Sequence, residues 1–182
     1  MKYDANIVDP TIAAQYSPDE IADAHRFVIR FIAEEGIDST LNDGTDVESW
    51  WSLNKEKVAP EFQENVKSQL SAGREFVNRR SWGQDNPWGF TYAYLADQPR
   101  VTARTITTQK IFSVNDKDRS IIVKADVDYS MQVKRPEGSA SPSMNNVRGY
   151  MQYAVRKDAA TGKWLLDGQV SSYEGFAPNT PK

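Results

Sequence analysis

The side chains that could carry out acid–base or metal chemistry are few in this chain. The 182 residues contain one histidine, His25, and no cysteine. The common zinc ligand sets and a cysteine nucleophile are therefore excluded. His25 lies among apolar residues at helical spacing, where it could be the base of an internal cavity. A histidine that is satisfied within the core or at its boundary is the favoured interpretation.

Two aspartates with a conceivable catalytic role lie in the segment IIVKADVDYSMQVK. A carboxyl group inside an apolar cavity, beside a hydrogen-bond donor, can act as a general base. Here Asp126 and Asp128 alternate with Val123 and Val127, so both carboxylates point to solvent if the valines face the core. We therefore interpret them as the solvated face of a strand, and we predict no catalytic residue.

Other chemical motifs are missing or weak. The sequence contains no glycine-rich phosphate loop and no GxSxG motif. The acidic residues of LNDGTDVE, residues 41–48, have the spacing of turns and helix caps and not that of an EF-hand. We predict neither a cofactor nor a metal site, although carboxylates could still hold a hard cation.

Tryptophans and arginines are the main candidates for partner binding. Trp50 and Trp51 are adjacent in a segment rich in charges. Large aromatic side chains are first of all core anchors, but successive helical residues point about 100° apart, so one of the two is expected at the rim or at an interface. For the tryptophans of RRSWGQDNPWGF, residues 79–90, anchoring of a loop and contact with a partner are both open. The predicted partner-binding residues are Trp51, Arg79, Arg80, Trp82 and Trp88.

Charge is unevenly divided along the chain, whose net charge is −3. Residues 1–73 contain 6 Lys and Arg against 14 Asp and Glu, whereas residues 74–182 contain 16 against 11. Attraction between two layers of one domain is the favoured interpretation, and a basic surface for an anionic partner is the other. The isoelectric point of about 5.3 argues against a dedicated nucleic-acid binder.

The first helix is specified at both ends in SPDEIADAHRFVIRFIAEEG, residues 17–36. Ser17 and Glu20 form a capping box, and Pro18 occupies the first helical position. Apolar residues then recur at helical spacing. Gly36 is the predicted C-terminal stop.

A second helical region follows with the same signals. Thr45 and Glu48 form another capping box, which predicts a helix that starts near Asp46 and carries both adjacent tryptophans. Pro60 interrupts this helix, because proline lacks a donor N–H and disfavours helical geometry at the residue before it. A new helix is predicted from Pro60, with an apolar stripe formed by Phe62, Val66 and Leu70.

The second part of the chain changes to the period of two that is typical of strands. Segments 101–114 and 121–134, joined by the turn NDKD, predict an antiparallel hairpin. VRGYMQYAVRK (147–157) and KWLLDGQVSSY (163–173), joined by DAATG, predict a second hairpin. The Pro-, Gly- and Ser-rich segment 135–146 is a predicted loop, and WGFTYAYLA (88–96) is a further predicted strand.

Helices followed by a long antiparallel meander define an α+β class. We predict N-terminal helices packed on a strongly curved antiparallel sheet of four to six strands. One domain of residues 17–175 is expected between tails at 1–16 and 176–182. The sequence has no run of about 18 apolar residues, and its start MKYDANIVDP lacks the regions of a signal peptide.

The helical segments SPDEIADAHRFVIRFIAEEG and ESWWSLNKEKVAPEFQENV, followed by strands that end in KWLLDGQ, resemble the cone fold of the nuclear transport factor 2-like superfamily. The resemblance covers residues 17–173. The paired tryptophans, the APEF segment and the long strands are also similar to extracytoplasmic domains of actinobacterial envelope proteins, and to TcpC and VirB-type components of conjugation and type IV secretion machinery. This resemblance implies an extracytoplasmic domain whose membrane anchor lies outside the given sequence. A full-length chain would instead be cytoplasmic.

Two functions are therefore expected. The favoured one is a non-enzymatic domain that acts through protein contacts in an envelope, conjugation or secretion assembly, with a homo-oligomer as one option. The alternative is a small-molecule-binding or ketosteroid-isomerase- or dehydratase-like enzyme that uses the cone cavity. A filled concave face with exposed aromatic residues favours assembly, whereas an open pocket with His25, or with a buried aspartate beside a tyrosine, favours the enzyme.

Overall fold

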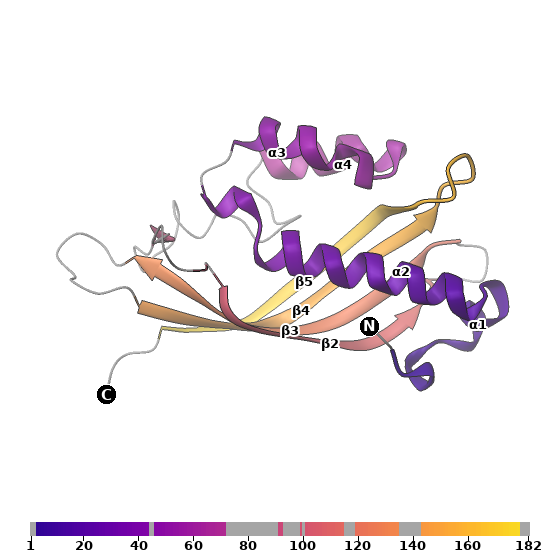
Figure 1. Cartoon of the computed structure of the whole chain (residues 1–182), viewed down its shortest axis with the longest axis horizontal. Coiled ribbons are helices and arrows are strands. Elements are labelled where there is room, and N and C mark those ends of the chain that lie inside the picture. The colour runs from indigo at the N-terminus through magenta and orange to yellow at the C-terminus, as the bar shows by residue number, and fades with distance from the viewer. Residues whose placement is uncertain are drawn as a thin grey trace.

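The computed structural model describes residues 3–43, 46–71, 91–92, 99, 101–114, 119–134 and 143–178. Helices of the N-terminal half lie against an antiparallel sheet (Figure 1), so the predicted α+β class is confirmed. The helical elements, with 3-10 and π-helical segments labelled η, are η1 (Ala5–Ile7), α1 (Pro10–Gln15), α2 (Pro18–Phe31), η2 (Ile32–Ile37), η3 (Thr40–Asp43), α3 (Val47–Asn54), η4 (Lys55–Lys57) and α4 (Pro60–Ser71). The strands are β1 (Thr91–Tyr92), β2 (Val101–Phe112), β3 (Ile121–Lys134), β4 (Ser143–Lys157) and β5 (Trp164–Pro178).

Helix α2 begins as its sequence predicts. The Ser17 hydroxyl accepts a hydrogen bond from the Glu20 amide at 3.3 Å, and the Glu20 carboxylate accepts one from the Ser17 amide at 3.1 Å. This reciprocal pair satisfies two amides that have no partner within the helix. One side of α2 is buried, as the spacing predicts, and consists of Ile21, Ala24, His25, Val28, Ile29 and Phe31.

The predicted stop at Gly36 is wrong, because the helix continues through this residue as the π-helical segment η2. A Cβ atom at Gly36 would lie 2.7 Å from the Sδ atom of Met151 on β4. The glycine therefore lets the end of the helix approach the sheet closely, a role that depends on a residue far away in the sequence.

The second helical region also follows its local signals, with one change. Helix α3 is capped by Asp46, whose carboxylate accepts a hydrogen bond from the Ser49 amide at 2.8 Å. Thr45, the predicted cap, lies outside the described residues. Helix α4 begins at Pro60 as predicted, and Val66 and Leu70 of its apolar stripe are fully buried.

The described strands form one antiparallel sheet with β3 at its centre. Strand β4 pairs with one edge of β3, β2 and the short β1 pair with the other edge, and β5 pairs with β4. Both predicted hairpins are thus confirmed. In the second, Gly162 adopts a φ of 69°, which suits glycine in the turn. The predicted loop 135–146 is shorter than expected, since β4 already begins at Ser143.

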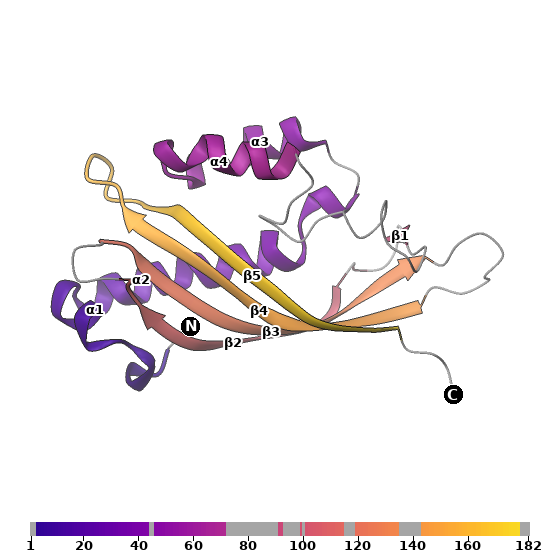
Figure 2. The ribbon, with the colours of Figure 1, turned by 180° about the vertical axis from the view of Figure 1, so that it is seen from behind.

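The helices are placed on one face and along one edge of this sheet. Helix α2 lies across one face, and α3 and α4 lie beside β5 (Figure 1). Val58 forms a bridge with Leu166 of β5, and the Ala59 amide donates to the Leu166 carbonyl at 2.8 Å. Figure 2 shows the opposite face, here called the outer face, with no described helix in front of it.

The core fills the space between α2 and the sheet. On β3, Val123, Ala125, Val127 and Tyr129 are buried while Asp126 and Asp128 are exposed, so the predicted register is confirmed. The largest fully buried side chains include Trp50, Tyr129, Tyr153, Ile12, Ile32, Ile37, Leu41, Leu70 and Met151.

Helix α1 and the end of β5 lie outside the range 17–175 that was predicted for the domain. Ile12 of α1 is fully buried, and Val8 bridges to Ile111 of β2, so the segment before Ser17 packs against the sheet. At the other end, β5 runs to Pro178. The packed structure therefore includes much of the predicted N-terminal tail.

Candidate functional site

The outer face of the sheet carries a groove of about 510 Å³. It arises because the antiparallel register aligns side chains from three strands in two neighbouring rows. The first row is Thr105, Asp128 and Arg148, and the second is Thr107, Asp126 and Tyr150.

The charged groups of this groove are paired with neighbours on the same face. Arg148 Nε lies 2.8 Å from the Asp128 carboxylate, and Gln109 donates to the Asp126 carboxylate at 2.6 Å. Lys124 Nζ lies 4.3 Å from the ring centroid of Tyr150, a cation–π geometry. Both carboxylates are exposed and paired, which is the composition of a polar contact surface.

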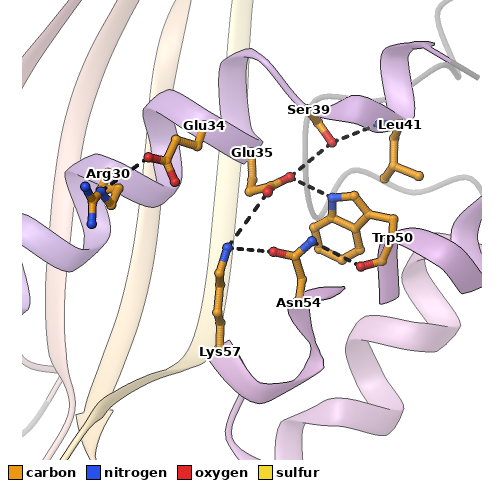
Figure 3. Close-up of polar contacts among 8 residues, drawn as sticks. All are labelled: Arg30, Glu34, Glu35, Ser39, Leu41, Trp50, Asn54 and Lys57. Carbon is orange, nitrogen blue, oxygen red and sulfur yellow. Dashed lines mark hydrogen bonds and ion pairs between the residues drawn. The ribbon is translucent and has the colours of Figure 1, made fainter. Parts of the chain in front are cut away.

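A second polar cluster is centred on Glu35 of η2 (Figure 3). Its carboxylate accepts hydrogen bonds from the Trp50 indole at 2.6 Å and from the Ser39 hydroxyl at 3.4 Å, and Lys57 lies 3.9 Å away. The Glu35 side chain is only 14% exposed. Burial raises its pKa above the ordinary glutamate value, against the opposing effects of Trp50, Lys57 and Ser39.

Glu35 was not predicted as a site residue, although the sequence contains a signal for it. The residue lies four positions after Phe31 and three after Ile32, and therefore on the continuation of the apolar side of α2. A buried tryptophan also needs a partner for its indole N–H. Together these two facts indicate that Trp50 needs a polar acceptor and that Glu35 faces the core. Nothing in the sequence shows that Glu35 is the acceptor for Trp50.

His25 is placed in the core, as its favoured interpretation predicts. It is 2% exposed, its Nε2 atom lies 2.8 Å from the Thr108 hydroxyl, and the Tyr3 ring packs at a centroid distance of 5.4 Å. The Nδ1 atom has no hydrogen-bond partner among the described residues. Burial lowers the pKa of His25, so the neutral imidazole is favoured.

The adjacent tryptophans both belong to the hydrophobic core. Trp50 is fully buried, which confirms the anchor interpretation for this residue, whereas Trp51 is 9% exposed. A partner contact by Trp51 would be limited to that exposed edge, and it stays a prediction. The other predicted partner-binding residues, Arg79, Arg80, Trp82 and Trp88, lie outside the described residues.

A second hollow, of about 860 Å³, lies at the start of α2 and includes Tyr16, Glu20, Arg119 and Lys157. Glu20 is held there by Lys157 at 2.9 Å as well as by its helix cap. The hydrogen bond from Lys157, followed by those from Ser17, lowers the pKa of Glu20 to about 2. A carboxylate so firmly ionised is a structural link between α2 and β4 and a poor proton donor at neutral pH.

Two further observations concern metal binding and membrane crossing in the described part of the chain. It contains no group of three or more His, Asp or Glu side chains placed to hold a metal ion. None of its helices combines the length and the apolar character that a bilayer crossing needs.

Comparison with models of protein families, with curated proteins and with solved structures gives no match to this chain. The described residues define an α+β domain with helices on the inner face of its sheet and a polar groove on the outer face. The superfamily resemblance stays a prediction.

Proposed function

We propose that this chain is a non-enzymatic domain that acts through protein contacts in an envelope, conjugation or secretion assembly. We further propose that it works on the extracytoplasmic side of the membrane. The assembly role and the location both rest on the sequence resemblance, and the geometry supports action through contacts.

The observation that carries the proposal is the filled inner face of the sheet. Trp50, Tyr129, Tyr153 and Met151 occupy the space beneath the helices with no more than 1% of their surface exposed. Neither of the two hollows described above includes His25 or Glu35. His25 is 2% exposed, so a substrate would have to displace core side chains to reach it.

The outer face supports the same proposal. Its described groove is formed by threonines, charged side chains and one tyrosine, which are suited to hydrogen bonds and ion pairs with another protein. Arg148 and Tyr150 of the groove are themselves hot-spot residue types, and the edge of Trp51 and the sequence cluster of Arg79, Arg80, Trp82 and Trp88 add further candidates.

A photocrosslinking experiment in the native host tests the proposed contacts. A photoreactive phenylalanine analogue at Thr105 or Thr107 would lie in the outer-face groove, and the same analogue at Asp23 on the exposed side of α2 is the matched control. We expect defined protein adducts from the groove positions and few from Asp23. Equal labelling from all three positions would contradict a contact surface on the outer face.

The enzyme alternative has its own test. An open apolar cavity binds the fluorescent probe 1-anilinonaphthalene-8-sulfonate at defined stoichiometry, whereas a filled core does not. We expect no saturable fluorescence increase from the native domain at neutral pH. Saturable one-to-one binding that Tyr129→Ala alters without unfolding would favour a cavity-based function instead.

A further inference from the structure

The Glu35 cluster joins elements that are separate in the sequence. The Trp50 indole on α3 donates to Glu35 Oε2 on η2 at 2.6 Å (Figure 3). Asn54, at the end of α3, donates from its side-chain amide to the Trp50 carbonyl at 3.1 Å. The junction of α3 and η4 is thereby tied to the end of the long helix that crosses the sheet.

Lys57 stands between two acceptors in this cluster. Its ammonium donates to the Asn54 side-chain carbonyl at 2.7 Å, whereas it lies 3.9 Å from Glu35 Oε1. A charge-assisted hydrogen bond between an ammonium and a carboxylate has a length of about 2.7–2.9 Å. The short contact of Lys57 therefore goes to the neutral amide, and its contact with the carboxyl group is too long for a direct hydrogen bond.

The surroundings of Glu35 favour its neutral form. The side chain is 14% exposed, and a buried carboxylate without a close cation is costly. Trp50 and Ser39 each donate to Oε2, and a neutral carboxylic acid can still accept both bonds through its carbonyl oxygen. Burial accordingly raises the pKa of Glu35.

The other charged groups around the cluster come from three elements. Glu34, the preceding residue, adds to the rise in the pKa of Glu35 and is itself paired with Arg30 at 3.3 Å. Asp38 caps the end of η2, and Arg104 of β2 donates to the Ala33 carbonyl at 3.0 Å. Among the described residues, Lys57 is the cation that lies within 4.0 Å of the Glu35 carboxyl group, at 3.9 Å.

We propose that Glu35, Lys57 and Asn54 form a proton-controlled clamp at the junction of α3 and η4. When Glu35 is protonated, Lys57 binds Asn54 and the turn is held as observed. When Glu35 loses its proton, the Lys57 ammonium moves to the carboxylate, and its hydrogen bond to the Asn54 side chain breaks. The segment after η4 is fixed to β5 by the hydrogen bond from the Ala59 amide to the Leu166 carbonyl. The clamp therefore changes the orientation of α3 relative to this segment. This inference does not depend on the proposed function.

The indole N–H resonance of Trp50 in two-dimensional nitrogen–proton NMR spectra reports the state of the clamp directly. Comparison with Trp50→Phe assigns this resonance among the five tryptophans. In the wild-type chain we expect it to shift with pH in a single-proton transition whose midpoint lies above the ordinary glutamate value. The Glu35→Gln variant keeps the acceptor for Trp50 and should lose the transition.

Two further variants separate a clamp from a merely structural hydrogen bond. Lys57→Met should move the midpoint to higher pH, because the ionised carboxylate then loses its cation. Glu34→Gln, the exposed neighbour, should retain the transition, with at most a small shift to lower pH. The proposal is overturned if the wild-type resonance does not titrate above the ordinary glutamate value, or if Lys57→Met leaves the midpoint unchanged in a folded protein.

Discussion

At the scale of single residues, the environment decides whether a carboxyl group in this protein is held as an ion. Glu20 is bound by Lys157 and by its helix cap, and its pKa falls to about 2. Glu35 accepts two hydrogen bonds as well, but burial is the larger effect and raises its pKa. The two glutamates flank the same helical region and are separated by 15 positions, so their difference comes from packing and not from local sequence.

The strand register predicts opposite outcomes for two neighbouring substitutions on β3. Val127 is 2% exposed, so Val127→Asp buries an unpaired charge and should destabilise the fold by about 3 kcal/mol or more. Asp128→Val removes only the exposed ion pair with Arg148, which is worth about 0–1 kcal/mol. Urea unfolding of both variants measures the difference, and similar midpoints would mean that the register is wrong.

His25 predicts a pH dependence of stability with a definite sign. Burial lowers the pKa of His25 in the folded state below the ordinary value of 6.5, so the unfolded chain binds its proton more readily. This contribution to the unfolding free energy is present above pH 6.5 and is lost as the pH falls through the lowered pKa. His25→Gln should therefore flatten the decline of stability between pH 7 and 5, as measured by chemical unfolding. Parallel curves for the two proteins would contradict a buried neutral histidine.

At the scale of elements, the capping residues indicate where a helix begins, and they do so from only a few neighbouring positions. The capping box of Ser17 and Glu20 satisfies amides of the first turn of α2, and Asp46 does the same for α3. The break before Pro60 follows from the covalent structure of proline. These features act within a few residues, which is why the starts of α2, α3 and α4 were predicted closely.

Loss of one cap should have a measurable cost. Ser17→Ala removes the acceptor for the Glu20 amide and should lower the unfolding free energy by about 0.5–2 kcal/mol. Ser52→Ala is the matched control, because Ser52 is exposed and its hydroxyl donates to the Glu48 carbonyl of its own helix at 2.9 Å. This substitution should change the unfolding free energy by less than about 0.5 kcal/mol. Thermal or urea unfolding measures the unfolding free energy of both variants. Equal losses would contradict a stabilising role for the capping hydrogen bond.

At the scale of the whole molecule, charge separation between the acidic first part and the basic second part predicts a salt-dependent self-association. Screening shortens the Debye length from about 10 Å at 0.1 M salt to about 3 Å at 1 M, so contacts steered by charge should weaken. Arg80→Ala or Trp82→Ala should reduce association without unfolding, whereas Arg26→Ala, which removes an exposed pair with Asp23, should not. Sedimentation at low and high salt measures this, and a strict monomer in both would leave only a different protein as partner.

The sequence by itself determined the features that depend on neighbours along the chain. The α+β class, the start of α2, the restart at Pro60, the two hairpins and the outward direction of Asp126 and Asp128 were all predicted. Each follows from a cap, a proline, a turn or a period of two, and such signals act over a few residues. The assembly role and the contacts of Arg79, Arg80, Trp82 and Trp88 remain predictions.

Only the tertiary structure decided which distant residues meet. Gly36 looked like a helix stop because its contact with Met151, 115 positions later, is invisible in the sequence. The outer-face groove requires the pairing of three strands in one register, and the Glu35 clamp requires that α3 fold back onto the end of α2. The free energy of a buried charge depends on these long-range neighbours, so the sequence predicted the elements of this protein but not the Glu35 cluster.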